Sequence, residues 1–177
     1  MEDKKEIRQF IRNEKKLRSA EQLREQSATI MSLLEMHERF QKAHVVLMYY
    51  ALPDEPSTQL KLDQWAREKE IILPVVVGSD LILRRYSGRD SLKEGAFHIL
   101  EPQGEIFEDY ASIELIVVPG MAFDVQGNRL GRGKGYYDKL LCHPLLKQAY
   151  KLGVCFDFQK IAHVPTMPFD VPMNEVL

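Results

Sequence analysis

One stretch of the chain concentrates residues suited to binding an anion. Within residues 127–138, called the glycine loop below, lie four glycines, three cations, two tyrosines and a carboxylate: Gly127, Gly131, Gly133, Gly135, Arg129, Arg132, Lys134, Tyr136, Tyr137 and Asp138. Glycine lets the backbone approach a ligand closely and adopt positive φ. Backbone N–H groups and cations together favour a bound anion, most naturally phosphate. The loop therefore predicts a site for a phosphorylated small molecule.

The glycine spacing matches neither of two common nucleotide-binding patterns. A Walker A loop needs a glycine where this chain has Asn128 and a serine or threonine where it has Gly135. A dinucleotide fingerprint has the order G-x-G-x-x-G, whereas this chain has G-x-G-x-G. The pattern favours an anion loop of another type, and the alternative is a glycine-rich turn with solvated cations.

Apolar strands alternate with helices along the chain, and one strand leads into this region. Periodicity and capping signals predict helices over residues 3–17, 20–34, 57–68 and 136–141. Apolar runs predict strands over residues 44–50, 71–77, 81–86, 113–118 and 152–156, with a further short one at 96–100. Prolines predict an extended tail from Val164. The alternation predicts a three-layer α/β/α sandwich with a mostly parallel central sheet, whose ligands sit at the strands' carboxyl ends.

Composition narrows the class of protein. The 177 residues fit one domain over 1–177, and 45% apolar with 28% charged residues is an ordinary globular balance. A net charge of −2 argues against nucleic-acid binding, and no apolar run is long enough for a membrane span. The charged N-terminus does not resemble a secretion signal, so we expect a cytoplasmic protein. Cys142 and Cys155 are then expected to be reduced and buried.

Five segments, in order along the chain, resemble the 5-formyltetrahydrofolate cyclo-ligase family. The long motif Pro119-Gly-x-Ala-Phe-Asp-x-x-Gly-x-Arg-Leu-Gly-Arg-Gly-Lys-Gly-Tyr-Tyr-Asp138 matches the family's signature nearly residue for residue. The other segments are Lys4-x-x-Ile-Arg8, Tyr49 to Thr58 with Glu55, Gly95-x-Phe-x-Ile-x-Glu-Pro102, and Phe156-x-x-Gln159 followed by Pro165 and Asp170. Three departures are Phe169 in place of a histidine, His98 where glycine is common, and an end at residue 177 that shortens the expected last strand.

The resemblance implies an ATP- and Mg²⁺-dependent cyclisation of 5-formyltetrahydrofolate, with or without a polyglutamate tail, to 5,10-methenyltetrahydrofolate. ADP and phosphate are released through a phosphorylated formyl intermediate. Phosphoryl transfer needs positioning and charge neutralisation more than a protein nucleophile, and the glycine loop suits that task. We expect a monomer that binds no nucleic acid and no membrane.

Residue roles follow from the same resemblance. The catalytic residues are Lys134, Arg132 and Tyr136. ATP contacts are Lys4, Arg8, Arg129, Leu130, Gly131, Arg132, Gly133, Lys134, Gly135, Tyr136 and Tyr137. Folate contacts are Tyr50, Glu55, Arg132, Gly133, Lys134, Gly135 and Tyr136. The Mg²⁺ carboxylates are Asp138 and Asp170.

Several of these residues have a simpler reading from the sequence alone. Lys4 and Arg8 share a helix face, and such pairs are most often solvated. Asp170 suits a turn-capping aspartate, Tyr137 suits the core, and so does Trp65. Two further functions stay open: a sugar-phosphate isomerase or CoA-transferase-like enzyme, sharing the sandwich and using Asp124 or Glu114 as its acid–base group, and a nucleotide- or metabolite-sensing module without turnover.

Overall fold

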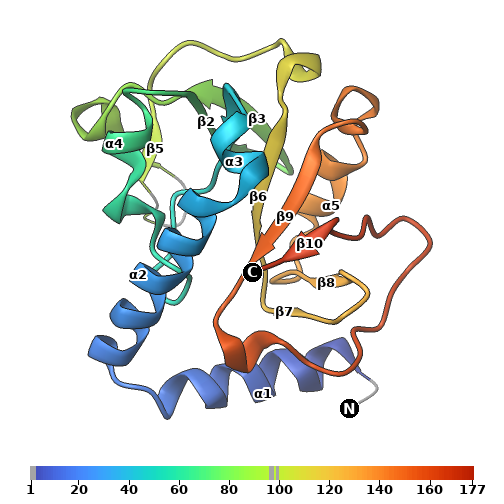
Figure 1. Cartoon of the computed structure of the whole chain (residues 1–177). Coiled ribbons are helices and arrows are strands. Elements are labelled where there is room, and N and C mark those ends of the chain that lie inside the picture. Colours follow the sequence, from blue (N-terminus) through green and yellow to red (C-terminus); the bar gives the residue numbers. More distant parts are fainter. Residues whose placement is uncertain (1–2, 96–97, 99) are drawn as a thin grey trace.

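The computed structural model describes residues 3–95, 98 and 100–177, and a six-stranded sheet forms its centre (Figure 1). The sheet strands are β1 (Val45–Leu47), β2 (Glu70–Val77), β3 (Asp80–Arg85), β6 (Leu115–Pro119), β9 (Tyr150–Val154) and β10 (Glu175–Val176). They lie in the order β10-β9-β6-β1-β2-β3. All neighbours pair in parallel except β2 and β3, which form an antiparallel hairpin at one edge. The predicted mostly parallel sheet is confirmed.

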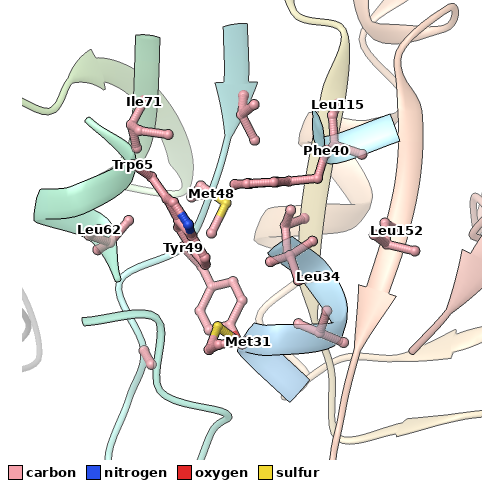
Figure 2. Packing of buried hydrophobic residues seen from close by; sticks show 14 of the residues in the cluster. Met31, Leu34, Phe40, Met48, Tyr49, Leu62, Trp65, Ile71, Leu115 and Leu152 are labelled. Atoms are coloured by element: carbon pink, nitrogen blue, oxygen red, sulfur yellow. The ribbon is translucent and has the colours of Figure 1, made fainter. Parts of the chain in front are cut away.

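Helices cover both faces of this sheet. One face is covered by α2 (Ala20–Met36), α3 (Glu38–Lys42) and α4 (Leu62–Trp65), and the other by α5 (Tyr136–Leu141). Helix α1 (Lys4–Lys16) packs outside the sheet. Successive strand residues point to opposite faces. Met48 and Leu115 face a core built with Trp65 and Phe40 from α4 and α3 (Figure 2), as expected for Trp65. Leu47, the last residue of β1 and the one before Met48, faces a second core with α5. The predicted three-layer sandwich is confirmed.

Helix α1 packs on a small hairpin that extends beyond β6 (Figure 1). The hairpin strands are β7 (Ala122–Phe123) and β8 (Arg129–Leu130). Ile7 and Ile11 are fully buried against it, whereas Phe10 and Leu17, expected near the same face, are exposed. The hairpin is narrow, so it covers only one stripe of the helix. The sequence did not predict β7 and β8, because two-residue strands are too short to show alternation.

Other boundaries differ from the predictions by a few residues. Strand β1 ends at Leu47 rather than at residue 50, and the helix expected over 57–68 is split into η1 (Thr58–Leu60) and α4. The remaining short elements are β4 (Leu92–Glu94), β5 (Leu100–Pro102), η2 (Arg89–Ser91), η4 (Tyr110–Ser112), η5 (Pro144–Leu146) and η6 (Asp157–Gln159). The strand predicted at 96–100 falls mainly on residues 96, 97 and 99, which lie outside the described residues. Among the described residues, no helix is both long and apolar enough to cross a membrane.

Three residues noted in the sequence can now be placed. His98 has φ +57°, a left-handed backbone region that glycine adopts most easily. Cys155 is buried as predicted, and burial raises the pKa of its thiol to about 12. Cys142 was expected to be buried but is exposed, because it caps the C-terminal end of the short helix α5.

Candidate functional site

A cavity of about 350 Å³ lies where β1, β2 and β6 end. Most of the predicted site residues line it: Tyr50, Glu55, Arg129, Gly131, Arg132, Lys134, Gly135, Tyr136, Tyr137 and Asp138. The carboxyl ends of parallel strands meet at this edge of the sheet, as the ligand-site rule for such folds requires. The sequence therefore predicted both the edge and the loops that form the cavity. Lys4, Arg8, Leu130, Gly133 and Asp170 are not among the described residues that line it.

The glycine loop holds a backbone shape that other residues would strain. Gly133 has φ +101° and Gly135 has φ +74°, both in the left-handed region. Gly135 precedes α5, so the loop turns sharply from β8 into that helix. Helix α1 supports the loop from outside, because Arg8 Nε donates a hydrogen bond of 2.8 Å to the carbonyl oxygen of Gly131. Arg8 was predicted to contact phosphate, and in the structure it holds the loop that carries the other residues predicted to bind phosphate.

Arg132 connects the glycine loop with the turn that follows β1. Its Nε and one terminal nitrogen lie 3.1 and 3.0 Å from Glu55 Oε1, and the same terminal nitrogen donates to Asp54 Oδ1. Burial alone would lower the pKa of Arg132, but Asp54 and Glu55 outweigh it and raise that pKa. Arg132 therefore stays charged beside two carboxylates.

Glu55 is held in place by its own turn. Its Oε2 accepts a hydrogen bond of 3.0 Å from the Leu52 N–H, while Oε1 faces Arg132. The residue is 9% exposed and lines the cavity. A carboxylate in this position can accept hydrogen bonds from the amino groups of a flat heterocycle.

Arg129 and Asp138 form a second ion pair within the glycine loop. The guanidinium of Arg129 donates to Asp138 Oδ1 at 2.7 Å and to the Pro119 carbonyl oxygen at 3.2 Å. It also lies over the ring of Tyr137, with 5.4 Å from Cζ to the ring centre. Arg129 is almost completely buried, so it joins β8 to α5 and orients Asp138 toward the cavity.

Aromatic side chains complete the cavity wall. Tyr137 lines the cavity while packing on the core beneath it, as expected for a core residue, and its contact with a ligand stays a prediction. Burial raises the pKa of its phenol, as does the charge of Glu55, so it remains neutral. Tyr136 also lines the cavity, and its hydroxyl donates to the carbonyl oxygen of Gly78, in the turn between β2 and β3, at 3.4 Å.

Lys4 and Asp170 pair with each other, away from the residues that line the cavity. Lys4 Nζ lies 3.1 Å from Asp170 Oδ2, which also accepts from the Met167 N–H at 2.8 Å. The second contact closes a turn, as the simpler reading of Asp170 expected. Searching the described residues reveals no group of three or more metal-ligating side chains.

Two residues of the site were missed by the sequence reasoning. Lys15 Nζ donates to Asp54 Oδ2 at 3.0 Å and to the Asp54 carbonyl oxygen at 2.6 Å. A signal existed, because Lys4, Arg8, Ile11 and Lys15 share the helical spacing that places them on one face of α1. Asp54 was overlooked because the matching motif pointed to its neighbour, Glu55.

The acids required by the alternative isomerase reading are already occupied by the backbone. Asp124 accepts from the main-chain N–H groups of Gln126, Asn128 and Val164, and Glu114 accepts from those of His44 and Val45. Neither is among the described residues that line the cavity. These carboxylates shape loops, so the structure gives no support to that alternative.

Fold and site together define an α/β sandwich protein whose cavity, at the carboxyl edge of the sheet, is lined among the described residues by three cations and three carboxylates. The chain belongs to the 5-formyltetrahydrofolate cyclo-ligase family, whose sequence pattern matches residues 1–177.

Individual relatives agree with this assignment. The 5-formyltetrahydrofolate cyclo-ligase of Haemophilus influenzae is 30% identical over 159 residues, covering 86% of this chain and 84% of the relative. That of Escherichia coli K12 is 25% identical over 174 residues, covering 95% and 96%. The solved structure of Aquifex aeolicus 5,10-methenyltetrahydrofolate synthetase superposes with a TM-score of 0.84 at 35% identity, covering 98% of this chain and 88% of that one. The similarity therefore extends over essentially the whole fold.

Proposed function

We propose that this chain catalyses the ATP-dependent cyclisation of 5-formyltetrahydrofolate to 5,10-methenyltetrahydrofolate, releasing ADP and phosphate. Family membership supports the reaction as a whole. The observation that carries the assignment to this site is that Arg132 and Lys134 line the same cavity as Glu55 and Tyr50. A phosphate-binding loop and a set of groups suited to a heterocycle thus meet in one space.

The glycine loop is the proposed phosphate site. Its positive-φ glycines expose backbone N–H groups, and two of its three cations, Arg132 and Lys134, balance the phosphate charge. Arg132 offers a planar fork to two phosphate oxygens, while Lys134 is a compact charge on a flexible stem. Lys134 is therefore the group best able to follow a phosphoryl group during transfer.

Glu55 and the tyrosines form the proposed folate site. Glu55 Oε1 would accept hydrogen bonds from pterin N–H groups, and Tyr50 and Tyr136 would pack on the ring. Because Glu55 already faces Arg132, the pterin and the phosphates would approach each other between these two residues.

The reaction needs no covalent bond to the protein. The formyl oxygen attacks the γ-phosphorus of ATP, and the bond to the ADP oxygen breaks. N10 then attacks the formyl carbon, which carries a good leaving group. N10 gives up its proton to water or to the departing phosphate, and phosphate leaves with the former formyl oxygen. Protein groups supply orientation and balance the charge on the transferring phosphoryl group. Tyr137, beneath the site, keeps part of the wall apolar.

Mg²⁺ fits this site through one carboxylate. Asp138 lines the cavity at the start of α5, with a third of its side chain exposed. Mg²⁺ commonly takes one or two protein carboxylates and completes its shell with water and phosphate oxygens. When bound with ATP it would neutralise phosphate charge. We propose Asp138 as its ligand here, whereas Asp170 holds Lys4 and a turn.

A direct assay tests the proposal. Purified protein is mixed with 5-formyltetrahydrofolate and Mg-ATP, and the absorbance of the methenyl product is followed. We expect an ATP-dependent rise with ADP formed in equal amount. Product formation without ATP, or ATP hydrolysis without product, would contradict the proposed reaction.

A further inference from the structure

The structure contains two buried lysines among its described residues, and they differ in what they bind. Lys151 is 6% exposed, and its Nζ donates only to main-chain oxygens, those of Leu146, Lys147 and Ala149. Lys15 is 8% exposed and donates to one main-chain oxygen and to the carboxylate of Asp54. Burial lowers the pKa of both amines. Lys151 holds a turn, whereas Lys15 is connected to the site.

The connection runs through the two oxygens of Asp54. Oδ2 accepts from Lys15 and Oδ1 accepts from Arg132, which is also bound to Glu55 Oε1. Charges alternate along this path: lysine, aspartate, arginine, glutamate. Burial favours the neutral acid, but Arg132 and Lys15 outweigh it and hold the pKa of Asp54 below its ordinary value. Asp54 therefore remains an anion shared by two cations.

Helix α1 is anchored well enough to act as a fixed support. Ile7 and Ile11 are fully buried against the β7–β8 hairpin. From the same helix face, Arg8 holds the Gly131 carbonyl and Lys15 holds the Asp54 turn. The helix thus binds both segments that carry the site residues, the glycine loop with Arg132 and the turn with Glu55, and it fixes the spacing between them.

We propose that Lys15 is a positioning residue for phosphate binding, acting through Asp54 on Arg132; this rests on the proposed function. When Lys15 is present, two cations share the negative charge of Asp54. The Arg132 guanidinium is then held less strongly and can move to bind phosphate. Without Lys15, Arg132 faces the undivided negative charge of Asp54 and Glu55. That charge retains the guanidinium and repels ATP.

The test compares Lys15→Met with Lys151→Met, because each removes one buried ammonium and keeps an apolar stem of similar length. For Lys15→Met we expect the KM for ATP to rise about tenfold, with the KM for folate changed less than about threefold. Lys151→Met is expected to leave both within about twofold when rates are corrected for the folded fraction. Lys15→Arg keeps the charge and is expected to restore the KM for ATP to within about threefold of the original.

A further variant and the activity of the wild-type protein complete the test. Asp54→Asn alters a partly exposed side chain and removes the charge that would hold Arg132, so it serves if Lys15→Met does not fold. Its KM for ATP is expected not to rise, and a rise would overturn the proposed path through Asp54. Equal effects of Lys15→Met and Lys151→Met on ATP, or no rescue by Lys15→Arg, would overturn the positioning role. An inactive wild-type protein would instead contradict the proposed function, so the two failures are distinguishable.

Discussion

Two loops that leave the central sheet carry carboxylates, and they use them in opposite ways. Asp124, in the hairpin beyond β6, is 4% exposed and accepts hydrogen bonds from three main-chain N–H groups and from Asn128 Nδ2. Glu55, in the turn after β1, is similarly buried but pairs with a charged side chain, Arg132. Backbone donors are fixed by the fold, whereas a guanidinium can move to another partner. Partner type, more than burial, separates an acid that maintains the fold from one that we propose binds a ligand.

The largest expected effect concerns Lys134, a residue of the proposed binding site. Lys134 is exposed on the glycine loop, so Lys134→Ala should change stability by less than about 0.5 kcal/mol. Loss of a cation that balances transition-state charge should lower kcat/KM about 100- to 1000-fold. Steady-state kinetics and urea unfolding measure the two quantities. A matched control is Lys139→Ala, which removes an exposed lysine paired with Asp80 on α5's outer side. Equal losses of activity and stability in Lys134→Ala would assign the loop a structural role.

Asp124→Ala should give the reverse pattern. The change leaves buried N–H groups of Asn128 and Val164 without their acceptor, which should lower the free energy of unfolding by about 3 kcal/mol. At a temperature where the variant is folded, kcat/KM should stay within about tenfold of the original. Urea unfolding followed by the cyclisation assay measures both. Unchanged stability with lost activity would place Asp124 among the reacting groups and break the comparison.

Glu55→Gln tests whether this buried carboxylate binds folate. The amide keeps the shape and one acceptor but loses the charge that pterin N–H groups would meet, so the KM for folate should rise about tenfold, or 1.4 kcal/mol. The KM for ATP should not rise, because Arg132 loses a competing partner. Glu114→Gln is the matched control, since that acid holds the N–H groups of His44 and Val45. A higher KM for ATP with unchanged folate affinity would reassign Glu55 to phosphate binding.

The sequence predicted the parts of the fold that local physics determines. Apolar runs gave the parallel strands, and Ser19 with Gln22 formed the capping box that opens α2. Trp65 was predicted to lie in the core and does. The β7–β8 hairpin escaped because its two-residue strands are too short to show alternation. Strand β10 pairs with the distant β9 and was expected only as a shortened last strand.

The candidate site also contains parts that the sequence predicted and parts that it did not. The glycine loop and Glu55 were predicted from motif and placement, and the cavity brings them together. Which cation meets which carboxylate was not predictable, because those choices depend on side chains far apart in sequence. Arg132 with Glu55, Lys4 with Asp170 and Lys15 with Asp54 all form across such separations. Arg8 illustrates the consequence, since it supports the loop through Gly131.

The smallest expected effect is a pH dependence that distinguishes the two acids by stability alone. Burial favours the neutral form of Asp124, but hydrogen bonds from Asn128, Val164 and Gln126 outweigh it and hold the pKa below the ordinary 3.8. A carboxyl whose pKa is lower in the folded state stabilises the fold fully above its unfolded pKa, and this contribution is lost as pH falls through the folded value. The stability gap between the original chain and Asp124→Ala should therefore be constant from about pH 7 to about pH 5 and narrow toward about pH 3.

Urea unfolding of both proteins across this pH range measures the stability gap. Other acids with lowered pKa values, such as Asp54 and Glu114, contribute equally to both proteins, so their contributions cancel in the difference. The same measurement on Glu55→Gln provides the contrast. Glu55 accepts one main-chain N–H where Asp124 accepts three, so its stability gap at about pH 7 should be the smaller of the two. A gap for Asp124→Ala that does not change between about pH 5 and about pH 3 would mean that its charged form gains nothing from the surrounding N–H groups. The hydrogen bonds would then maintain the loop by shape alone, and partner type would no longer separate the two carboxylates.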